Sequence, residues 1–236
     1  MRKGGTGGFL SGLAKIHVDT GLSASTPLLL ATTNPAKQST LRELLAGLSL
    51  RLVTPQELGL TAAPEEVGDT HEEIARLKAR EWSLAADMLV IATDGGLVIP
   101  ALGGRWESRF THRFAGPAAD DSERISRLLD LMRTYKDNQR AASWVEALAI
   151  ADRGQVLASW ELAGSAGVIA ESAQGKPYVP GFWAFTVWEF PNLGKIYNQL
   201  SQQERESLGD HWGRLRALVQ EFFREYLARR RGQGSR

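Results

Sequence analysis

A short apolar run followed by a capped helix, between Leu28 and Leu48, constrains the fold of this chain more than any other stretch. Residues 28–31 read Leu-Leu-Leu-Ala, which is the pattern of a short buried strand. Asn34 and Pro35 have the residue types that favour the N-cap and the first position of a helix. Apolar side chains then recur at helical spacing, at Leu41, Leu44, Leu45 and Leu48. The sequence therefore predicts a strand, a polar loop and a helix that packs back on the strand.

The loop between this strand and this helix has the features of an anion-binding site. Thr32 and Asn34 are small side chains that form hydrogen bonds, and Lys37 adds a positive charge in the first helical turn. A helix start presents free backbone N–H groups and the positive end of the helix dipole, both of which favour an anion. An ordinary capped turn without a ligand has the same local sequence, so this stretch alone leaves both interpretations open.

The balance of charges argues against a general attraction to nucleic acid or to an anionic membrane. The 236 residues carry 28 lysines and arginines against 27 aspartates and glutamates, so any anion site must be local. The sequence has no cysteine, which excludes a disulfide, a thiolate zinc site and a cysteine nucleophile and fits a cytoplasmic location. Its four histidines have no metal-ligand spacing, so a bound metal would be a hard ion such as Mg²⁺ or Mn²⁺ held by carboxylates. No apolar run approaches the length of a membrane span.

Helices and strands continue to alternate beyond the first unit. Thr70 and Glu73 form the pattern of a capping box, and the helix that they begin carries Lys78. An apolar run over residues 88–92 predicts a buried strand that ends before Asp94. This places an acid at the carboxyl end of a strand, where open α/β sheets bind their ligands, although a turn aspartate would have the same sequence context.

The second half of the chain is rich in helix and turn signals but poor in motifs. Asp120 and Ser201 are expected to cap helices, and the segment Asp152-Arg-Gly154 is expected to connect two strands in a hairpin. The aromatic stretch over residues 182–190 is expected to belong mainly to the core, because aromatic side chains bury so much area.

We expect a single domain over residues 27–228. The segment before it, residues 1–26, is rich in glycine, serine and threonine and lacks the apolar core of a signal peptide, so we expect a flexible tail there. The last helix leads into Arg229-Arg-Arg231, and residues 229–236 are expected to form a basic tail that suits a helix C-terminus.

Four short motifs, in order along the chain, resemble those of the inosine triphosphate pyrophosphatase family. Ala31-Thr-Thr-Asn-Pro-Ala-Lys37 looks like the family's A-T-x-N-x-x-K phosphate loop. Glu65-Glu-Val-Gly-Asp-Thr-His-Glu-Glu-Ile-Ala-Arg-Leu-Lys-Ala79 is similar to its acidic loop and E-N-A-x-x-K-A helix. Ala92-Thr-Asp-Gly-Gly-Leu97, with Ala101-Leu-Gly-Gly104 after it, is similar to A-D-D-S-G-L and A-L-x-G. Thr111-His-Arg-Phe-Ala-Gly116 looks like S-A-R-Y-x-G.

The resemblance implies an enzyme that hydrolyses non-standard purine nucleoside triphosphates, such as ITP, XTP and dITP, to the monophosphate and pyrophosphate. The fold that it implies is α/β, with two lobes around a long mixed β-sheet flanked by helices and with the active-site cleft between the lobes. It also implies Mg²⁺ as cofactor, with Mn²⁺ able to replace it, and a homodimer.

The family's functional positions map onto this chain residue by residue. Glu66 and Asp94 are expected to bind the metal, with Glu65 as the neighbour that could be confused with Glu66, and Asp94 is expected to orient or deprotonate the attacking water. Lys78 is expected to reach the same anion from the second helix, unless it forms only a surface pair with Glu81. The residues expected to bind substrate are Thr32, Asn34, Lys37, Arg113, Phe182, Arg205 and His211.

The positions that read the base depart from the family pattern. The family's G-F-G-Y-D-P-x-F appears as Gly181-Phe-Trp-Ala-Phe-Thr-Val-Trp188, without the aspartate, and its S-H-R appears as Asp210-His-Trp212. A tryptophan in place of the arginine cannot hydrogen-bond the six-position oxygen of a purine in the same way. Thr93 replaces the first acid of the D-D pair. We therefore expect an altered or relaxed base preference.

These departures leave two other hypotheses open. The missing acid at Thr93 would suit a catalytically idle nucleotide-binding or regulatory protein on the same scaffold. The third hypothesis is a phosphatase or pyrophosphatase that acts on a non-nucleotide substrate. The enzyme hypothesis requires four side chains to line one cleft, namely Lys37, Glu66, Lys78 and Asp94.

Overall fold

The computed structural model of the protein describes residues 25–60, 64–173 and 179–233. The strands are β1 (Thr26–Leu30), β2 (Leu50–Val53), β3 (Leu89–Val98), β4 (Ala141–Asp152), β5 (Gln155–Ile169), β6 (Trp188–Phe190) and β7 (Lys195–Ile196). The α-helices are α1 (Pro35–Leu44), α2 (His71–Ala86), α3 (Asp121–Leu131), α4 (Gln202–Ser207) and α5 (His211–Gln233). The 3₁₀ helices are η1 (Pro100–Arg105), η2 (Ser108–Phe110), η3 (Asp137–Arg140), η4 (Trp183–Thr186), η5 (Pro191–Leu193) and η6 (Tyr197–Gln199).

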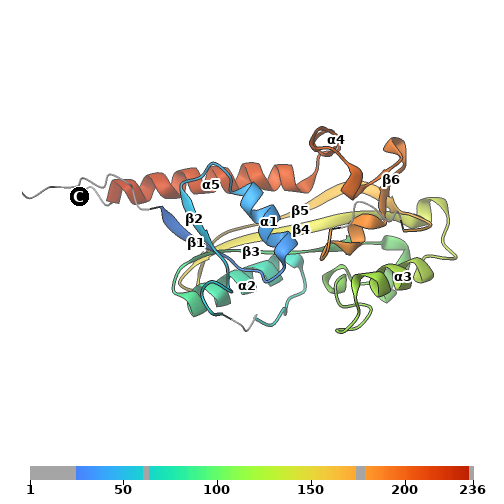
Figure 1. The fold of residues 1–236 in the computed structure, drawn as a ribbon, viewed down its shortest axis with the longest axis horizontal. Helices are drawn as coiled ribbons and strands as arrows, with labels where there is room; N and C mark the ends of the chain where they lie inside the picture. The colour runs from blue at the N-terminus through green and yellow to red at the C-terminus, as the bar shows by residue number, and fades with distance from the viewer. Residues whose placement is uncertain (1–24, 61–63, 174–178, 234–236) are drawn as a thin grey trace, which may run out of the picture.

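All seven of these strands form one mixed sheet in the order β2-β1-β3-β4-β5-β6-β7. The strand β1 is parallel to both β2 and β3, whereas every later pair is antiparallel. The long hairpin of β4 and β5 runs the length of the molecule and joins its two ends (Figure 1). The structure thus confirms the expected α/β fold with a long mixed sheet flanked by helices.

The first strand, loop and helix form as the sequence predicts. Asn34 has extended backbone angles, and its side-chain oxygen accepts hydrogen bonds from the backbone N–H groups of Ala36 at 2.9 Å and Lys37 at 3.4 Å. Pro35 occupies the first turn, where the missing N–H costs nothing. The cap thereby fixes where α1 begins relative to the end of β1.

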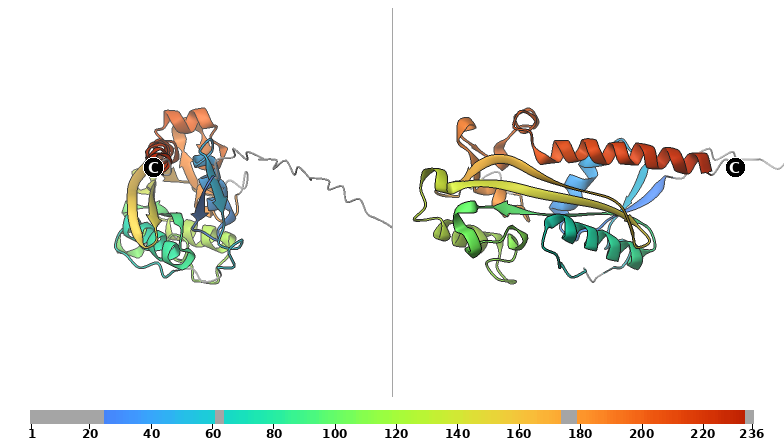
Figure 2. Two further views of the ribbon diagram at one scale, coloured as in Figure 1. Left: turned by 90° about the vertical axis from the view of Figure 1, so that its left-hand side faces the viewer. Right: turned by 180° about the vertical axis from the view of Figure 1, so that it is seen from behind.

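Alternate residues of β1 face opposite sides of the sheet. Leu28 and Leu30 pack with the leucines of α1 and with Leu215, Val219 and Phe223 of α5. Leu29 and Ala31 pack on the other side with the buried face of α2. The helices α1 and α5 therefore cover one face and α2 covers the other (Figures 1 and 2). This arrangement explains the continuous apolar run, because a strand with both faces buried needs no polar alternation.

A second core lies at the other end of the sheet and is dominated by aromatic side chains. It includes Trp106, Trp144, Phe182, Trp183, Phe185, Trp188, Phe190 and Tyr197, all at most 8% exposed. The rings of Phe182 and Phe185 stack with their centroids 4.9 Å apart. The expectation that the aromatic stretch belongs to the core is confirmed. Its backbone is mainly the turn η4 and the short strand β6, since close ring packing requires no long strand.

The turns and caps of the second half also follow the sequence. Arg153 and Gly154 both have positive φ, 47° and 82°, and connect β4 to β5 as a two-residue hairpin turn. Asp120 caps α3 and Ser201 caps α4, each through a complete capping box.

The expected end of the strand before Asp94 is wrong, because β3 continues through Val98. The pairing of β3 with β1 ends at Ile91, but β4 continues to pair with β3 from Leu89 to Val98. Asp94 therefore lies within a strand, just beyond the point where β1 and β3 separate. Antiparallel pairing satisfies the backbone there, which local sequence does not reveal.

The helix α5 extends through Gln233, so the expected domain boundary at residue 228 falls inside it and Arg229–Arg231 are helical. Most of the expected N-terminal tail, residues 1–24, lies outside the described residues, as do residues 234–236. Within the described ranges, none of the helices combines the length and apolar character needed to cross a bilayer.

We expect Phe223→Ala to destabilise the whole fold, because this side chain is fully buried between α5, α1 and the sheet. Removing a buried phenylalanine ring typically costs about 3–5 kcal/mol in the free energy of unfolding. Urea denaturation measures this loss, with Leu84→Ala as control because Leu84 is 52% exposed. Equal stabilities of the two variants would show that α5 does not pack on the domain.

Candidate active site

A single cleft collects most of the residues expected to act on substrate. It lies beyond the end of β1, between the first lobe and the aromatic core. Its lining includes Lys37, Glu66, Lys78 and Asp94, so the condition set by the enzyme hypothesis is met. Thr32, Asn34, Arg113 and Phe182 line the same cleft.

Lys78 is the centre of a charge network at the floor of the cleft. Its Nζ lies 2.9 Å from Glu66 Oε1 and 3.5 Å from Asp94 Oδ1, with only 12% of the side chain exposed. Arg113 contacts the other oxygen of Glu66 at 2.8 Å. The surface pair of Lys78 with Glu81 is therefore excluded, and of the two adjacent acids it is Glu66, rather than the exposed Glu65, that enters the cleft.

The network keeps both acids ionised and Lys78 charged. Burial by itself opposes the charged form of each group, but the neighbouring opposite charges and hydrogen bonds outweigh it. The pKa of Asp94 is held below its usual value by the hydrogen bond from His71 and the charge of Lys78. The pKa of Glu66 is lowered by Lys78, and that of Lys78 is raised by Asp94 and Glu66.

The start of α1 forms the other wall of the cleft. Asn34 uses its side-chain oxygen as the helix cap, and its Nδ2 lies 3.5 Å from the carbonyl of Gly181 in the second lobe. Gly181 has φ +87°, and a Cβ there would lie 2.7 Å from Asn34 Nδ2. The two lobes thus touch at this glycine. Any side chain at this position would force the lobes apart.

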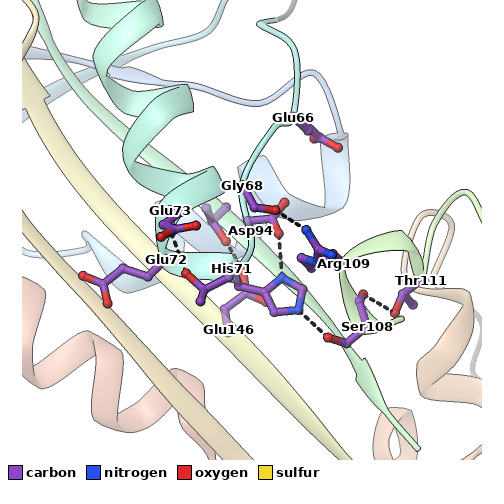
Figure 3. Close-up of polar contacts among 12 residues, drawn as sticks. Glu66, Gly68, His71, Glu72, Glu73, Asp94, Ser108, Arg109, Thr111 and Glu146 are labelled. Atoms are coloured by element: carbon purple, nitrogen blue, oxygen red, sulfur yellow. Dashed lines mark hydrogen bonds and ion pairs between the residues drawn. The ribbon is translucent and has the colours of Figure 1, made fainter. Parts of the chain in front are cut away.

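Local sequence did not single out His71 and Ser108, although both belong to this site. His71 Nδ1 lies 2.6 Å from Asp94 Oδ2, and His71 Nε2 lies 3.0 Å from Ser108 Oγ (Figure 3). His71 is the first residue of α2, and Ser108 begins η2. Their separation of 37 residues carries no recognisable spacing, so only the tertiary structure could bring them together.

Two residues expected to contact substrate lie away from this cleft. His211 is fully buried and stacks beside Tyr197 with ring centroids 6.2 Å apart. Arg205 lines a separate hollow and lies over the ring of Tyr197, with its guanidinium carbon 4.9 Å from the ring centroid. In the structure, neither side chain lines the cleft. Both side chains pack against Tyr197 instead. The spacing of single residues in the sequence does not reveal such aromatic packing.

The aromatic end of the cleft is lined by Trp144, Phe182 and Trp183. Their positions suit stacking against a flat base. Trp144 Nε1 donates to Glu146 Oε2 at 2.8 Å, and this acid is fully buried beneath the cleft. Glu146 Oε1 also accepts the hydroxyl of Thr93, the residue that replaces the family's first acid. The carboxylate of Glu146 on β4 thus lies beside Thr93 on β3, where the family motif has an acid.

The donor set fits a hard divalent ion that arrives with a polyanionic ligand. In the part of the chain that the structure describes, no three His, Cys, Asp or Glu side chains group closely enough to hold a metal alone. Mg²⁺ commonly uses one or two protein carboxylates together with substrate phosphates. Glu66 and Asp94 are two carboxylates of this kind in the cleft, and both lie close to Lys78.

We expect Lys78→Met to destabilise the protein by about 3–5 kcal/mol at pH 7, because it leaves Asp94 ionised and buried without its cation. In the parent, the lowered pKa values of Glu66 and Asp94 stabilise the fold above about pH 4.5, and this contribution is lost as the pH falls further. The free energy of unfolding should therefore fall less between pH 7 and pH 3 in the variant than in the parent. Denaturant unfolding across this pH range measures both effects.

The matched control is Lys136→Met, because Lys136 forms an ion pair with Glu171 in which both side chains are more than half exposed. Its free energy of unfolding should stay close to that of the parent. An unchanged stability and pH dependence in Lys78→Met would contradict the buried network.

The model of the Ham1 family matches residues 28–220. The chain is 33% identical over 198 residues to a dITP/XTP pyrophosphatase of Pectobacterium atrosepticum, covering 81% of this chain and 95% of the relative. It is 34% identical over 196 residues to a dITP/XTP pyrophosphatase of Thermus thermophilus, covering 83% of this chain and 91% of the relative.

A solved structure of a HAM1 protein from Coxiella burnetii superposes with a TM-score of 0.69 at 28% identity, covering 83% of this chain and 99% of the other. These matches span nearly the whole described domain and include both lobes. Together with the four motifs, they show that the chain belongs to the Ham1 family, the inosine triphosphate pyrophosphatases that its sequence resembles.

Proposed function

We propose that this protein hydrolyses the bond between the α and β phosphates of non-standard nucleoside triphosphates such as dITP, XTP and ITP, and releases pyrophosphate. The observation that carries the proposal is the cleft in which Lys37, Lys78, Glu66 and Asp94 converge, with aromatic rings at its other end. The two relatives compared above are named dITP/XTP pyrophosphatases, and this chain covers more than 90% of the length of each. The enzyme is therefore a hydrolase of phosphoanhydride bonds.

The charges of the cleft suit a triphosphate. The start of α1 and Lys37 would hold phosphate oxygens, with Thr32 beside them, because free N–H groups and the helix dipole attract anions. Lys78 and Arg113 would approach the same polyanion from the opposite wall. Preorganised cations of this kind stabilise the charge that develops on the leaving pyrophosphate.

Asp94 is the proposed acceptor for the attacking water. It is 7% exposed, ionised and aimed toward Lys78 in the cleft, so it can accept a hydrogen bond from a water held beside the α phosphate. Its lowered pKa makes it a weak base but a strong orienting group for that water.

Glu66 and Asp94 would hold Mg²⁺ or Mn²⁺, the divalent ion that the family resemblance implies. When bound, such an ion neutralises phosphate charge and makes water more acidic. The fit of the donor set supports this assignment, because both acids supply hard oxygen ligands and remain ionised at neutral pH.

Base preference is proposed to rest on stacking more than on hydrogen bonds. Trp144, Phe182 and Trp183 line the aromatic end, whereas His211 lies outside the cleft. A pocket that relies on ring surfaces discriminates less between bases than one that pairs with polar edges. This supports relaxed selection among non-standard bases.

The catalytically idle alternative rests on Thr93, which replaces an acid of the family motif. Glu146 weakens that argument, because it places a carboxylate against the Thr93 hydroxyl.

We further propose a homodimer in the cytoplasm without nucleic-acid or membrane partners. The resemblance supports the dimer and the balanced charge supports the lack of such partners; size-exclusion chromatography with light scattering tests the oligomeric state.

The proposal predicts that dITP, XTP or ITP is converted to the monophosphate and pyrophosphate in the presence of Mg²⁺, and that Asp94→Asn lowers kcat by roughly 10²–10⁴-fold. The amide keeps the shape of the carboxylate but removes its charge. Coupled detection of pyrophosphate, with orthophosphate measured in parallel, gives the rate and identifies the bond that is cleaved.

Asp87→Asn is the matched control, since Asp87 is an exposed helix cap in the left-handed region that asparagine also tolerates. Its kcat should equal that of the parent. If the parent binds these nucleotides but releases no pyrophosphate with Mg²⁺ or Mn²⁺, the idle-protein hypothesis replaces this one.

A further inference from the structure

We propose that His71, held in place by Ser108, is a positioning residue that fixes the carboxylate of Asp94 for hydrolysis. This inference rests on the proposed function, because it assigns a task to a residue behind the same site. Neither His71 nor Ser108 is among the residues that line the cleft. Both therefore act on substrate only through Asp94.

Both ring nitrogens of His71 are engaged. Nδ1 lies 2.6 Å from Asp94 Oδ2, and Nε2 lies 3.0 Å from Ser108 Oγ. An ionised carboxylate only accepts, so Nδ1–H donates to Asp94; in the neutral ring, Nε2 then accepts the hydroxyl hydrogen of Ser108. His71 is only 4% exposed, so a ring with both nitrogens in use has a single orientation.

The two carboxylate oxygens of Asp94 have different partners. Oδ2 is committed to His71, whereas Oδ1 lies 3.5 Å from Lys78 Nζ at the cleft. Rotation of the carboxylate would break the short His71 contact. The oxygen that faces substrate is therefore selected by a residue on the far side of Asp94.

Ser108 is itself fixed to the strand that carries Asp94. The carbonyl of Ser108 accepts from Thr111 Oγ1 at 2.7 Å, and that hydroxyl oxygen accepts the backbone N–H of Leu97 at 2.9 Å. A Cβ at Gly96 would overlap the Ser108 carbonyl oxygen, so only glycine permits this approach. The chain from Ser108 through His71 to Asp94 thus ties η2, α2 and β3 into one rigid unit.

Such a unit matters because hydrolysis requires the attacking water and the phosphorus to be aligned. A displacement of about 1 Å in a catalytic group can lower the rate about 100-fold. A histidine that only stabilised the core would not have this signature: its replacement would lower stability and leave kcat unchanged.

The test compares His71→Asn with His71→Gln, because each amide replaces one ring nitrogen. The Asn amide nitrogen reaches the place of Nδ1 and can still donate to Asp94, whereas the Gln amide reaches the place of Nε2 and contacts only Ser108. We expect kcat for pyrophosphate release from dITP to fall about 100-fold in His71→Gln and no more than about fivefold in His71→Asn, with KM within about threefold of the parent in both.

Ser108→Ala provides a second, milder test that leaves the imidazole in place. Its kcat should fall about threefold at unchanged KM, less than in either His71 variant, because the ring keeps its contact with Asp94 but loses the partner that orients it. Ser207→Ala is its control, since the Ser207 hydroxyl bonds only to the exposed turn of α4 at Glu204, and its kcat should equal that of the parent. Thermal unfolding of every variant shows whether it is folded at the assay temperature.

Equal losses of kcat in His71→Asn and His71→Gln would overturn the inference, as would a rise in KM at constant kcat. If neither His71 variant folds, an unchanged kcat in Ser108→Ala overturns it. These failures differ from failure of the proposed function, in which the parent itself releases no pyrophosphate.

Discussion

Lys78 is buried between two carboxylates, and the cleft depends on that arrangement. A buried ammonium is stable only when acids surround it, and buried acids stay ionised only beside a cation. Glu66 comes from the loop before α2, Lys78 from α2 itself and Asp94 from β3, so the network joins three segments. It therefore both closes the floor of the cleft and keeps the charges that a metal–phosphate ligand requires.

The sheet places this network where a long ligand can reach it. The strands β1 and β3 separate beyond Ile91, and the space that opens leads from the capped start of α1 to Asp94. The hairpin of β4 and β5 continues past this point and carries the aromatic lobe. A triphosphate at one end and a base at the other match the two chemical halves of the cleft.

The two halves of the cleft also differ in the interactions that hold their side chains. At the phosphate end, Asn34 caps α1 and Lys78 balances the charges of Glu66 and Asp94. At the other end aromatic packing dominates, and His211 and Arg205 pack near Tyr197, away from the cleft. Behind the cleft, the Thr93 hydroxyl of β3 donates to Glu146, a fully buried acid on the neighbouring strand β4.

Local chemistry determined much of this protein from sequence alone. The cap at Asn34, the buried run at Leu28 and the turn at Gly154 are fixed by interactions within a few residues, so their patterns predicted the elements correctly. The motifs likewise located Lys37, Glu66, Lys78 and Asp94, whose order along the chain carried the resemblance to the family.

Only the tertiary structure decided the contacts between distant segments. The length of β3 depends on its pairing with β4, and the link from Ser108 through His71 to Asp94 depends on three segments meeting. The burial of His211 likewise follows from packing against Tyr197. Such contacts leave no periodicity or spacing in the sequence, because their partners are set by how the sheet and its helices fold together.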